Sequence, residues 1–569
     1  MKKQKRTETK VAAAVESPPP RPKWWPKWWQ WLGALVALFL VFEVYGPALN
    51  GPFVFDDLSL PFMNPRAAMA PFREWVSGLR PLLMLSFWID YRLSGTETHA
   101  YHVTNVFLHF CTSLLIAIAT GKLLQWAGVT GRHREALAVL AGGIFLLHPL
   151  QTESVAYAAS RSEVLSVFFY FAAFAIFLYR GERSMTILRA VAIVLLFGAA
   201  VATKEHTLTL PALLLLTDFF WHPREIRKNA LVYGLLILAG IAGGLFVLRT
   251  LRTANTAGFG MRDLSPATYF FTQCRVIWTY VRMFALPFGQ NLDPEVPLSS
   301  SLLSHGAIVG LVALLGAVAA AWIYRKRWPL ASYGVFVFLL LLAPTSSIIP
   351  IRDVLAERRL YLPMIGLILI VLEFARRLKV EHIIGAGAAV LVIFSVLTYQ
   401  RSEVWGDPIA LWQDTSVKSP NKQRPRFQLA RALFDEQRYT DAVNSYEIAS
   451  KLGPNNDALL VDWALALDSA GRPNEALEKL NQAVQRRPSA HIYSQIGMIY
   501  AKQGRYPEAL AELERAEQLN PRFEMTYVYR GNIYAISGDK AAAAIQYERA
   551  LRINPLNQPA IDALARVNR

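Results

Sequence analysis

Cysteine is almost absent from this sequence, and its scarcity narrows the chemistry that the chain can carry. Only two of the 569 residues are cysteine, Cys111 and Cys274, and both lie in apolar or aromatic surroundings. A disulfide between them is one interpretation, but two buried thiols are the interpretation that we favour. No cluster of cysteine and histidine has zinc-site spacing, and no glycine-rich phosphate loop follows a strand. The sequence therefore offers no zinc motif and no nucleotide-binding loop.

Charged residues are too few for a uniformly soluble chain and too many for a simple membrane bundle. They make up 18% of the sequence, while 53% is hydrophobic and the mean hydropathy is +0.26. Composition of this kind indicates two unlike parts joined in one chain.

The net charge of +17 raises the question of a nucleic-acid partner, but the distribution of the charges argues against one. Lys and Arg gather in short clusters between apolar stretches, as they do in the cytoplasmic loops of membrane proteins. We therefore expect membrane lipids, and no nucleic acid, as partners. The clusters are residues 1–6, 132–134, 180–189, 224–228, 325–327 and 376–379.

Apolar stretches long enough or nearly long enough to cross a bilayer fill the first 400 residues. With the amino terminus in the cytoplasm, every basic cluster falls on the cytoplasmic side, and about eleven crossings place the carboxyl terminus outside. The sequence thus predicts an all-α polytopic bundle over 31–400. The expected spans are 31–49, 102–121, 136–151, 164–180, 187–203, 205–221, 229–249, 303–324, 329–345, 360–376 and 382–399.

Residues 1–30 are expected to form a disordered basic tail on the cytoplasmic side. Five tryptophans between positions 24 and 31 are typical of an aromatic belt at the inner membrane interface, beside lysines near anionic headgroups. A specific partner site in this segment is the alternative, which we consider the weaker one.

Prolines with a regular period mark the last quarter of the chain. The period is that of the tetratricopeptide repeat, a 34-residue helix–turn–helix unit. Four repeats fill 420–554 and a capping helix completes a domain over 420–569, with 401–419 as a linker. Its concave surface is expected to bind a protein or an extended peptide, and a structural appendage is the alternative. The prolines are Pro420, Pro454, Pro488, Pro521 and Pro555, at intervals of 34, 34, 33 and 34 residues.

Ionisable residues concentrate in the segments that this topology places outside. Ionisable groups at membrane depth are costly and are functional candidates by default. An ordinary acidic loop at 56–57 and interfacial anchoring by the arginines are the alternatives. Two further outer segments, 72–92 and 267–286, mix aromatics with arginine and are expected to be amphipathic helices. The candidates are Asp56, Asp57, His148, Glu153, Arg161, Glu163, Lys204, Glu205, His206, Glu357, Arg358 and Arg359.

Several of these motifs are familiar as a set. The segments FVFDD, RPLLMLSFWIDYRL, HVTNVFLH, HPLQTESVAYAASRSEVLS, TKEHTLTLP and ERRLYLP, followed by tandem repeats, occur in this order. Together they resemble the transmembrane and tetratricopeptide-repeat O-mannosyltransferases, which are membrane glycosyltransferases of GT-C type. Short loops, four repeats and compact length suggest a bacterial relative in the cytoplasmic (inner) membrane, with the repeats in the periplasm.

The resemblance implies an enzyme that moves a sugar from a polyprenyl-phosphate carrier, with inversion, to an acceptor outside. Ser or Thr of exported proteins is the acceptor that we favour, and a glycan or a lipid head group is the alternative. The resemblance places the catalytic acids at Asp56 and Asp57, one as general base. Lys204, Arg358, Arg359 and Arg161 would hold the donor phosphate, with His148, Glu153, Glu205 and His206 as further active-site candidates. No cofactor is expected, and we do not favour a divalent metal.

Two other functions compete with this interpretation. A transporter or flippase of lipid-linked sugars would carry ionisable residues near the bilayer midplane and show duplicated halves. A non-enzymatic scaffold would need one or two spans to anchor its repeats, and would have no use for clustered acids and bases. The donor sugar and the acceptor have no code that can be read in the sequence.

Overall fold

A computed structural model describes residues 28–180, 185–251, 257–259, 261 and 263–568, and the helix content predicted from the sequence is confirmed. Within these residues the only β pairing is an isolated bridge between Ala257 and Ile351. Each expected span coincides with a helix. These helices are α1 (Trp28–Tyr45), α5 (Thr98–Trp126), α6 (Gly131–Leu147), α8 (Arg161–Leu178), α9 (Ile187–Val201), α10 (Leu210–Trp221), α11 (Ala230–Leu251), α13 (Ala307–Ile323), α14 (Pro329–Leu342), α15 (Met364–Ala375) and α16 (Val380–Gly406).

Fewer of these helices meet a strict length criterion for crossing a membrane. Among the described residues, five are long and apolar enough, and a sixth is added if the bent pair Gly131–Leu147 and Pro149–Ala156 forms one span. Several others are shorter apolar helices of 10–17 residues. The multi-pass character of the bundle is therefore supported, while the number of crossings stays a prediction.

Close backbone contact fixes the helix pair α14 and α15. A Cβ atom added at Gly334 would lie 2.5 Å from the carbonyl oxygen of Gly366, and one added at Gly366 would lie 2.6 Å from that of Gly334. Small residues let helices approach closely where lipid provides no hydrophobic drive for association. A side chain at either position would separate the two helices.

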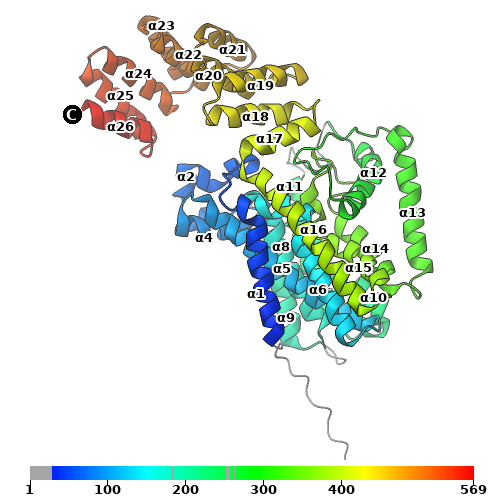
Figure 1. Cartoon of the computed structure of the whole chain (residues 1–569). Helices are drawn as coiled ribbons and strands as arrows, with labels where there is room; N and C mark the ends of the chain where they lie inside the picture. Colours follow the sequence, from blue (N-terminus) through cyan, green and yellow to red (C-terminus); the bar gives the residue numbers. More distant parts are fainter. Residues whose placement is uncertain (1–27, 181–184, 252–256, 260, 262, 569) are drawn as a thin grey trace, which may run out of the picture.

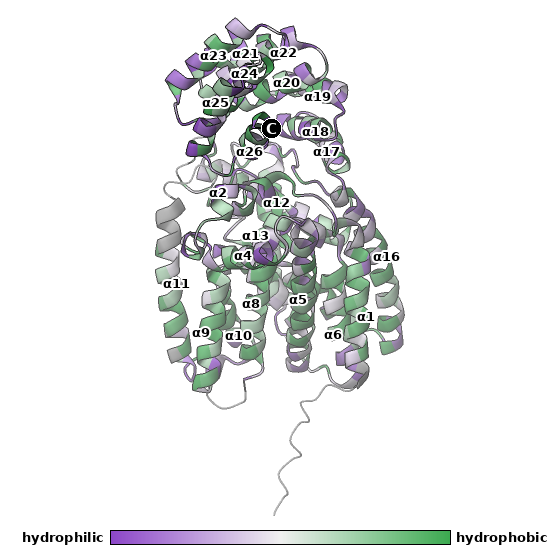
Figure 2. Ribbon diagram, turned by 90° about the vertical axis from the view of Figure 1, so that its left-hand side faces the viewer, coloured by the Kyte–Doolittle hydropathy of each residue, from purple (hydrophilic) through white to green (hydrophobic). Residues whose placement is uncertain are grey.

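Polar segments gather at one end of the bundle, between the apolar helices and the repeats (Figure 2). The segment 267–286 is an amphipathic helix, as predicted: α12 (Pro266–Ala285). The segment 72–92 is not one helix, because the turn between Val76 and Arg80 separates a short α3 (Phe72–Trp75) from α4 (Pro81–Ser94). Ahead of them lie a 3-10 helix at Phe55–Ser59 and α2 (Pro65–Ala68). Both cysteines are free thiols, Cys274 buried and Cys111 partly exposed.

The repeat array follows α16 and curves over the polar end of the bundle (Figure 1). The segment predicted as a linker is helical instead: it contains the end of α16 and then α17 (Pro408–Lys418), which packs on the first repeat. Of the tail, residues 1–27 lie outside the described residues, and α1 begins at Trp28. Four helix pairs and a cap form the array: α18 (Gln423–Asp435), α19 (Tyr439–Leu452), α20 (Asp457–Ser469), α21 (Pro473–Arg486), α22 (Ala490–Lys502), α23 (Tyr506–Leu519), α24 (Glu524–Ile536), α25 (Lys540–Ile553) and α26 (Gln558–Val567).

Candidate active site

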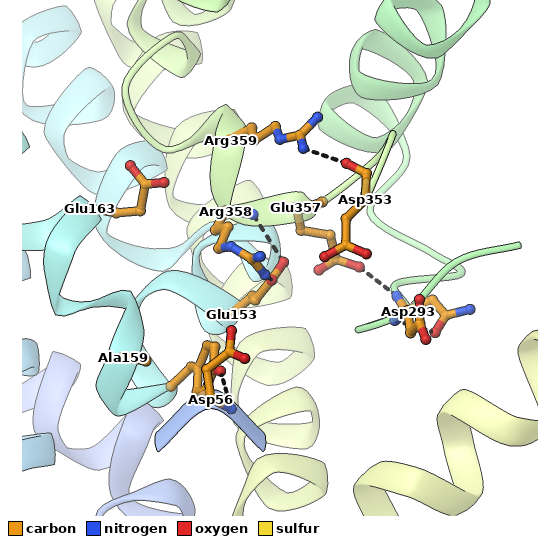
Figure 3. Close-up of polar contacts among 12 residues, drawn as sticks. Asp56, Glu153, Ala159, Glu163, Asp293, Asp353, Glu357, Arg358 and Arg359 are labelled. Carbon is orange, nitrogen blue, oxygen red and sulfur yellow. Dashed lines mark hydrogen bonds and ion pairs between the residues drawn. The ribbon is translucent and has the colours of Figure 1, made fainter. Parts of the chain in front are cut away.

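The acidic pair in the segment between α1 and α4 occupies two different environments. Asp57 is fully buried, and its carboxylate accepts backbone N–H groups from Val54 at 3.1 Å and Ala159 at 2.6 Å. Asp56 is exposed, and its backbone N–H donates to the hydroxyl of Tyr157 at 2.8 Å (Figure 3). Asp57 thus connects the segment between α1 and α4 to the segment before α8, while the Asp56 carboxylate stays at the surface.

Burial changes the acidity of Asp57. Desolvation raises the pKa of Asp57 to about 7, although the N–H groups of Val54 and Ala159 oppose the rise by stabilising the charged form. The neighbouring Asp56 charge adds to the rise. Asp57 therefore titrates near neutral pH.

Glu153 and Arg358 form a buried ion pair close to this loop. Glu153 is 1% exposed, accepts the backbone N–H of Arg358 at 2.9 Å and also pairs with its guanidinium. Among the described residues, Glu153 is the side-chain partner of the Arg358 guanidinium, which it contacts at Nη1. Arginine carries five N–H donors, so Nε and Nη2 remain for a ligand. Glu153 therefore orients Arg358 and leaves some of its N–H donors available.

Lys204 and Glu163 form a second pair at the same polar end. The Lys204 ammonium lies 2.5 Å from a carboxylate oxygen of Glu163 and 3.2 Å from the hydroxyl of Ser162. His206 lies 3.5 Å from the other oxygen of Glu163. The electrostatic interactions of Arg358 reach both Lys204 and Glu163. Lys204 and Arg358, which are distant in sequence, are thus close enough to interact electrostatically.

Glu205 faces a different partner. Its carboxylate receives two bonds from Arg80, at 3.2 Å from Nε and 2.8 Å from Nη2. Beside this pair lies an apolar hollow of about 390 Å³ between α9, α11 and the start of α4. Leu79, Pro81, Phe197, Gly198, Val201, Ala239 and Gly243 are among its lining residues. A charged pair therefore borders an apolar cavity that runs along the bundle helices.

Arg161 is bound to partners inside the protein. Its side chain is fully inaccessible, pairs with Asp90 at 2.6 Å and donates to Asn105 at 2.9 Å and to the carbonyl oxygen of Tyr101 at 2.8 Å. The guanidinium also lies 4.6 Å from the ring centroid of Phe87. These partners use its donors inside the protein, which argues against a role for Arg161 as a phosphate ligand.

Arg359 and His148 likewise form hydrogen bonds with backbone groups, and not with Asp56. Arg359 points away from Arg358 (Figure 3) and donates to the carbonyl oxygens of Asp353, Thr345 and Val354. His148 is fully buried: one ring nitrogen contacts the carbonyl oxygen of Phe284 at 3.0 Å and the other accepts the backbone N–H of Leu150. His148 therefore braces the bend between α6 and α7 (Thr152–Ala156).

Glu357, which the sequence grouped with Arg358 and Arg359, is 2% exposed and accepts the backbone N–H of Asn291 at 2.5 Å, and burial raises the pKa of Glu357 to about 8. Sequence reasoning did not identify Asp293 and its partners. Asp293 is 3% exposed and pairs with Lys422 and Arg424 of the repeat segment, which comprises residues 408–568 from α17 to the end of the array. An isolated Asp-Pro or Lys-x-Arg pattern carries no signal of such a pairing, because the partners are about 130 residues apart.

A metal site has no obvious ligand set here. In the part of the chain that the structure describes, no group of three or more His, Cys, Asp or Glu side chains could hold a metal ion. Metal independence stays a prediction.

The fold and site define the chain as a helical, multi-pass membrane protein with a tetratricopeptide-repeat array over a charged site. A family described as Tetratricopeptide repeat matches residues 427–491, 461–522 and 494–557. The chain is 24% identical over 449 residues to Protein O-mannosyl-transferase F38B6.6 of Caenorhabditis elegans, covering 74% of this chain and 63% of that protein.

Two further relatives extend this similarity. Protein O-mannosyl-transferase TMTC3 of Mus musculus is 22% identical, with 80% of this chain and 55% of that protein covered. TMTC4 of Homo sapiens is 24% identical, with 75% of this chain and 66% of that protein covered. The chain is therefore a relative of the TMTC-type protein O-mannosyl-transferases, as its motifs indicated, and spans a little over half the length of the first two.

Proposed function

We propose that this protein is a membrane glycosyltransferase that moves a sugar, with inversion, from a polyprenyl-phosphate carrier to a hydroxyl group of an exported protein. The observation that carries the proposal is the arrangement of Asp56, Lys204 and Arg358. An exposed carboxylate lies at the same polar end as two cations that are each held by a buried glutamate. The relatives named protein O-mannosyl-transferases favour mannose as the sugar.

Asp56 serves as the general base. The acceptor oxygen attacks the anomeric carbon, the bond from that carbon to the phosphate oxygen breaks, and the hydroxyl proton passes to Asp56. Asp56 suits this role because its carboxylate is exposed, whereas both oxygens of Asp57 accept backbone N–H groups. A single displacement from the face opposite the leaving phosphate inverts the anomeric configuration.

Lys204 and Arg358 stabilise the departing lipid phosphate. Negative charge grows on the phosphate oxygens as the sugar leaves, and fixed cations that need no reorganisation lower the barrier. Glu163 and Glu153 hold the two cations in place without consuming all their donors. The planar guanidinium of Arg358 suits bidentate binding of a phosphate.

A lipid carrier agrees with the surroundings of these cations better than a soluble nucleotide does. The apolar hollow beside Glu205 would take prenyl units next to the phosphate site. The distribution of Lys and Arg supports a site on the extracytoplasmic side of a bacterial inner membrane, where soluble nucleotide sugars would be scarce. The repeats, on the same side, would bind the exported protein or peptide acceptor.

Two experiments test the proposal. Purified protein is supplied with polyprenyl-phosphate mannose or with a nucleotide sugar and a Ser/Thr peptide, and we expect a hexose-sized mass increase only with the lipid donor. In the native host, glycopeptide mass spectrometry compares a deletion strain with strains restored by wild type or Asp56→Asn. Exported proteins should lose a hexose on deletion and regain it only with wild type. No change in any exported protein would refute protein glycosylation and favour a glycan or lipid acceptor or a transporter.

A further inference from the structure

Phe55, the residue before Asp56, has an unusual backbone conformation. Its φ is +53°, in the left-handed region that residues with a side chain seldom adopt. Such a conformation persists only where surrounding structure holds it. The direction in which Asp56 projects depends on this residue, because a change of φ at Phe55 rotates everything that follows it.

Two side chains of the repeat segment contact the ring of Phe55. The ring of Trp412 in α17 packs edge-on against the ring of Phe55, with centroids 5.7 Å apart. On the same ring lies the guanidinium carbon of Arg424 in α18, 5.2 Å from the centroid. Both side chains are more than 350 residues away in sequence from the loop that they touch.

Arg424 is itself fixed by two other outer loops. It donates to both carboxylate oxygens of Asp293, at 2.6 Å and 2.5 Å, and to Asp353 at 2.8 Å. Lys422 adds a contact of 2.6 Å to Asp293. A bidentate pair with a buried carboxylate gives the guanidinium a defined orientation. Arg424 therefore joins the loops that contain Phe55, Asp293 and Asp353.

The loop that contains Asp293 is also connected by hydrogen bonds to the proposed phosphate site. Asn291 donates from its side chain to Ser419 at 2.8 Å and from its backbone N–H to Glu357 at 2.5 Å. Glu357 directly precedes Arg358 (Figure 3). The start of the repeat segment thus contacts Phe55, which precedes the proposed base, and is connected through Asn291 to Glu357, which precedes one proposed phosphate ligand.

The far end of the array is docked as well. Arg66 of α2 donates to the carbonyl oxygen of Ile553 at 3.0 Å. The first outer loop therefore touches the array near its beginning and near its end, which limits the freedom of the array to swing as a tethered module.

We propose that Trp412 and Arg424 are positioning residues for Asp56, so that the repeat segment is a structural part of the active site and not only a carrier of the acceptor. This inference rests on the proposed function for its kinetic consequence. If the array only delivered the acceptor, loosening its contact with Phe55 would raise KM and leave kcat unchanged. A positioning role lowers kcat at a saturating concentration of even a short Ser/Thr peptide.

The test uses full-length protein in lipid nanodiscs. Trp412→Ala, Arg424→Gln and Arg424→Lys are compared with wild type and with Arg438→Gln, a matched control whose arginine pairs with Asp441 on an exposed face of the first repeat. We expect Arg424→Gln and Trp412→Ala to lower kcat about tenfold to a hundredfold, with the peptide KM within about twofold, because misplacing a reacting group by about 1 Å can cost a hundredfold. Arg424→Lys should recover part of the rate, since lysine keeps the charge opposite Asp293 but not the two-bond geometry. Arg438→Gln should match wild type.

A second measurement does not depend on activity. Hydrogen–deuterium exchange over residues 52–60 should quicken in Trp412→Ala and Arg424→Gln and stay unchanged in Arg438→Gln. Unchanged exchange, a wild-type kcat in both variants, or a rise in KM alone would overturn the positioning role. If wild-type protein transfers no sugar from any lipid donor, the proposed function fails, and the exchange experiment still decides whether the array holds this loop.

Discussion

Asp56 and Asp57 are adjacent in sequence, yet the carboxylate of Asp56 is exposed to solvent, whereas that of Asp57 is buried and accepts backbone N–H groups of Val54 and Ala159. The alternation follows from the 3-10 turn at Phe55–Ser59, in which successive side chains point in different directions. Two residues that the sequence cannot tell apart thus acquire separate roles.

Substituting each aspartate by asparagine should separate those roles. Asp56→Asn should fold and insert normally but lower transfer by about a hundredfold or more, as expected for removal of a general base. Asp57→Asn places an amide N–H₂ against a backbone N–H and should lower stability by about 1–3 kcal/mol. Thermal unfolding of purified protein and the transfer assay measure the two effects. Wild-type transfer by Asp56→Asn would move the base elsewhere.

Stability should depend on pH through Asp57. Its folded pKa of about 7 lies above the 3.8 of an unperturbed aspartate, so the folded state binds the proton more tightly than the unfolded chain does. The contribution of Asp57 to the free energy of unfolding is therefore largest below about pH 4 and falls as the pH rises toward about 7. Above that pH the contribution is constant, and its total change is at most about 4 kcal/mol. Because asparagine does not titrate, the deficit of Asp57→Asn relative to wild type should be larger at pH 5 than at pH 8. An equal deficit at both values would show that Asp57 is charged throughout.

Lys204 should contribute to stability and to donor binding in ways that a double substitution can separate. Lys204→Met leaves Glu163 buried without its cation and should cost about 3–5 kcal/mol. Adding Glu163→Gln removes the stranded charge and should restore much of the stability, while affinity for polyprenyl phosphate stays low. Lys451→Met, which breaks an exposed pair with Glu447, is the control and should change stability by less than about 1 kcal/mol. Donor affinity equal to wild type in the double variant would exclude Lys204 as a phosphate ligand.

Arg161 should act on the fold and not on the donor. Arg161→Gln strands the carboxylate of Asp90, which is 7% exposed, and should destabilise the protein by about 3–5 kcal/mol. Arg161→Gln combined with Asp90→Asn should recover part of that loss. In the protein that remains folded, donor affinity measured by titration should match wild type. A selective loss of donor affinity at normal stability would return Arg161 to the phosphate site, where the sequence motif had placed it.

Hydropathy and repeat spacing alone predicted much of the architecture. Apolar stretches of 16–22 residues led directly to helices, because a helix satisfies its backbone hydrogen bonds within its own segment and so needs no distant partner. The 34-residue period likewise led to the repeat array, since each repeat packs chiefly on its neighbours in sequence. The break at 76–80 and the helical linker at 408–418 were missed, because tertiary packing overrides local composition in short segments.

The sequence by itself therefore determined the helical elements, their order and the set of ionisable residues at the polar end. Only the tertiary structure decided how those residues are used: that Asp57 is sealed and Asp56 open, that Arg161 pairs with Asp90, and that Arg424 reaches Phe55 and Asp293. The physical reason is that burial and charge pairing depend on partners brought together from positions 70 to 370 residues apart, and neither composition nor spacing encodes which of them meet.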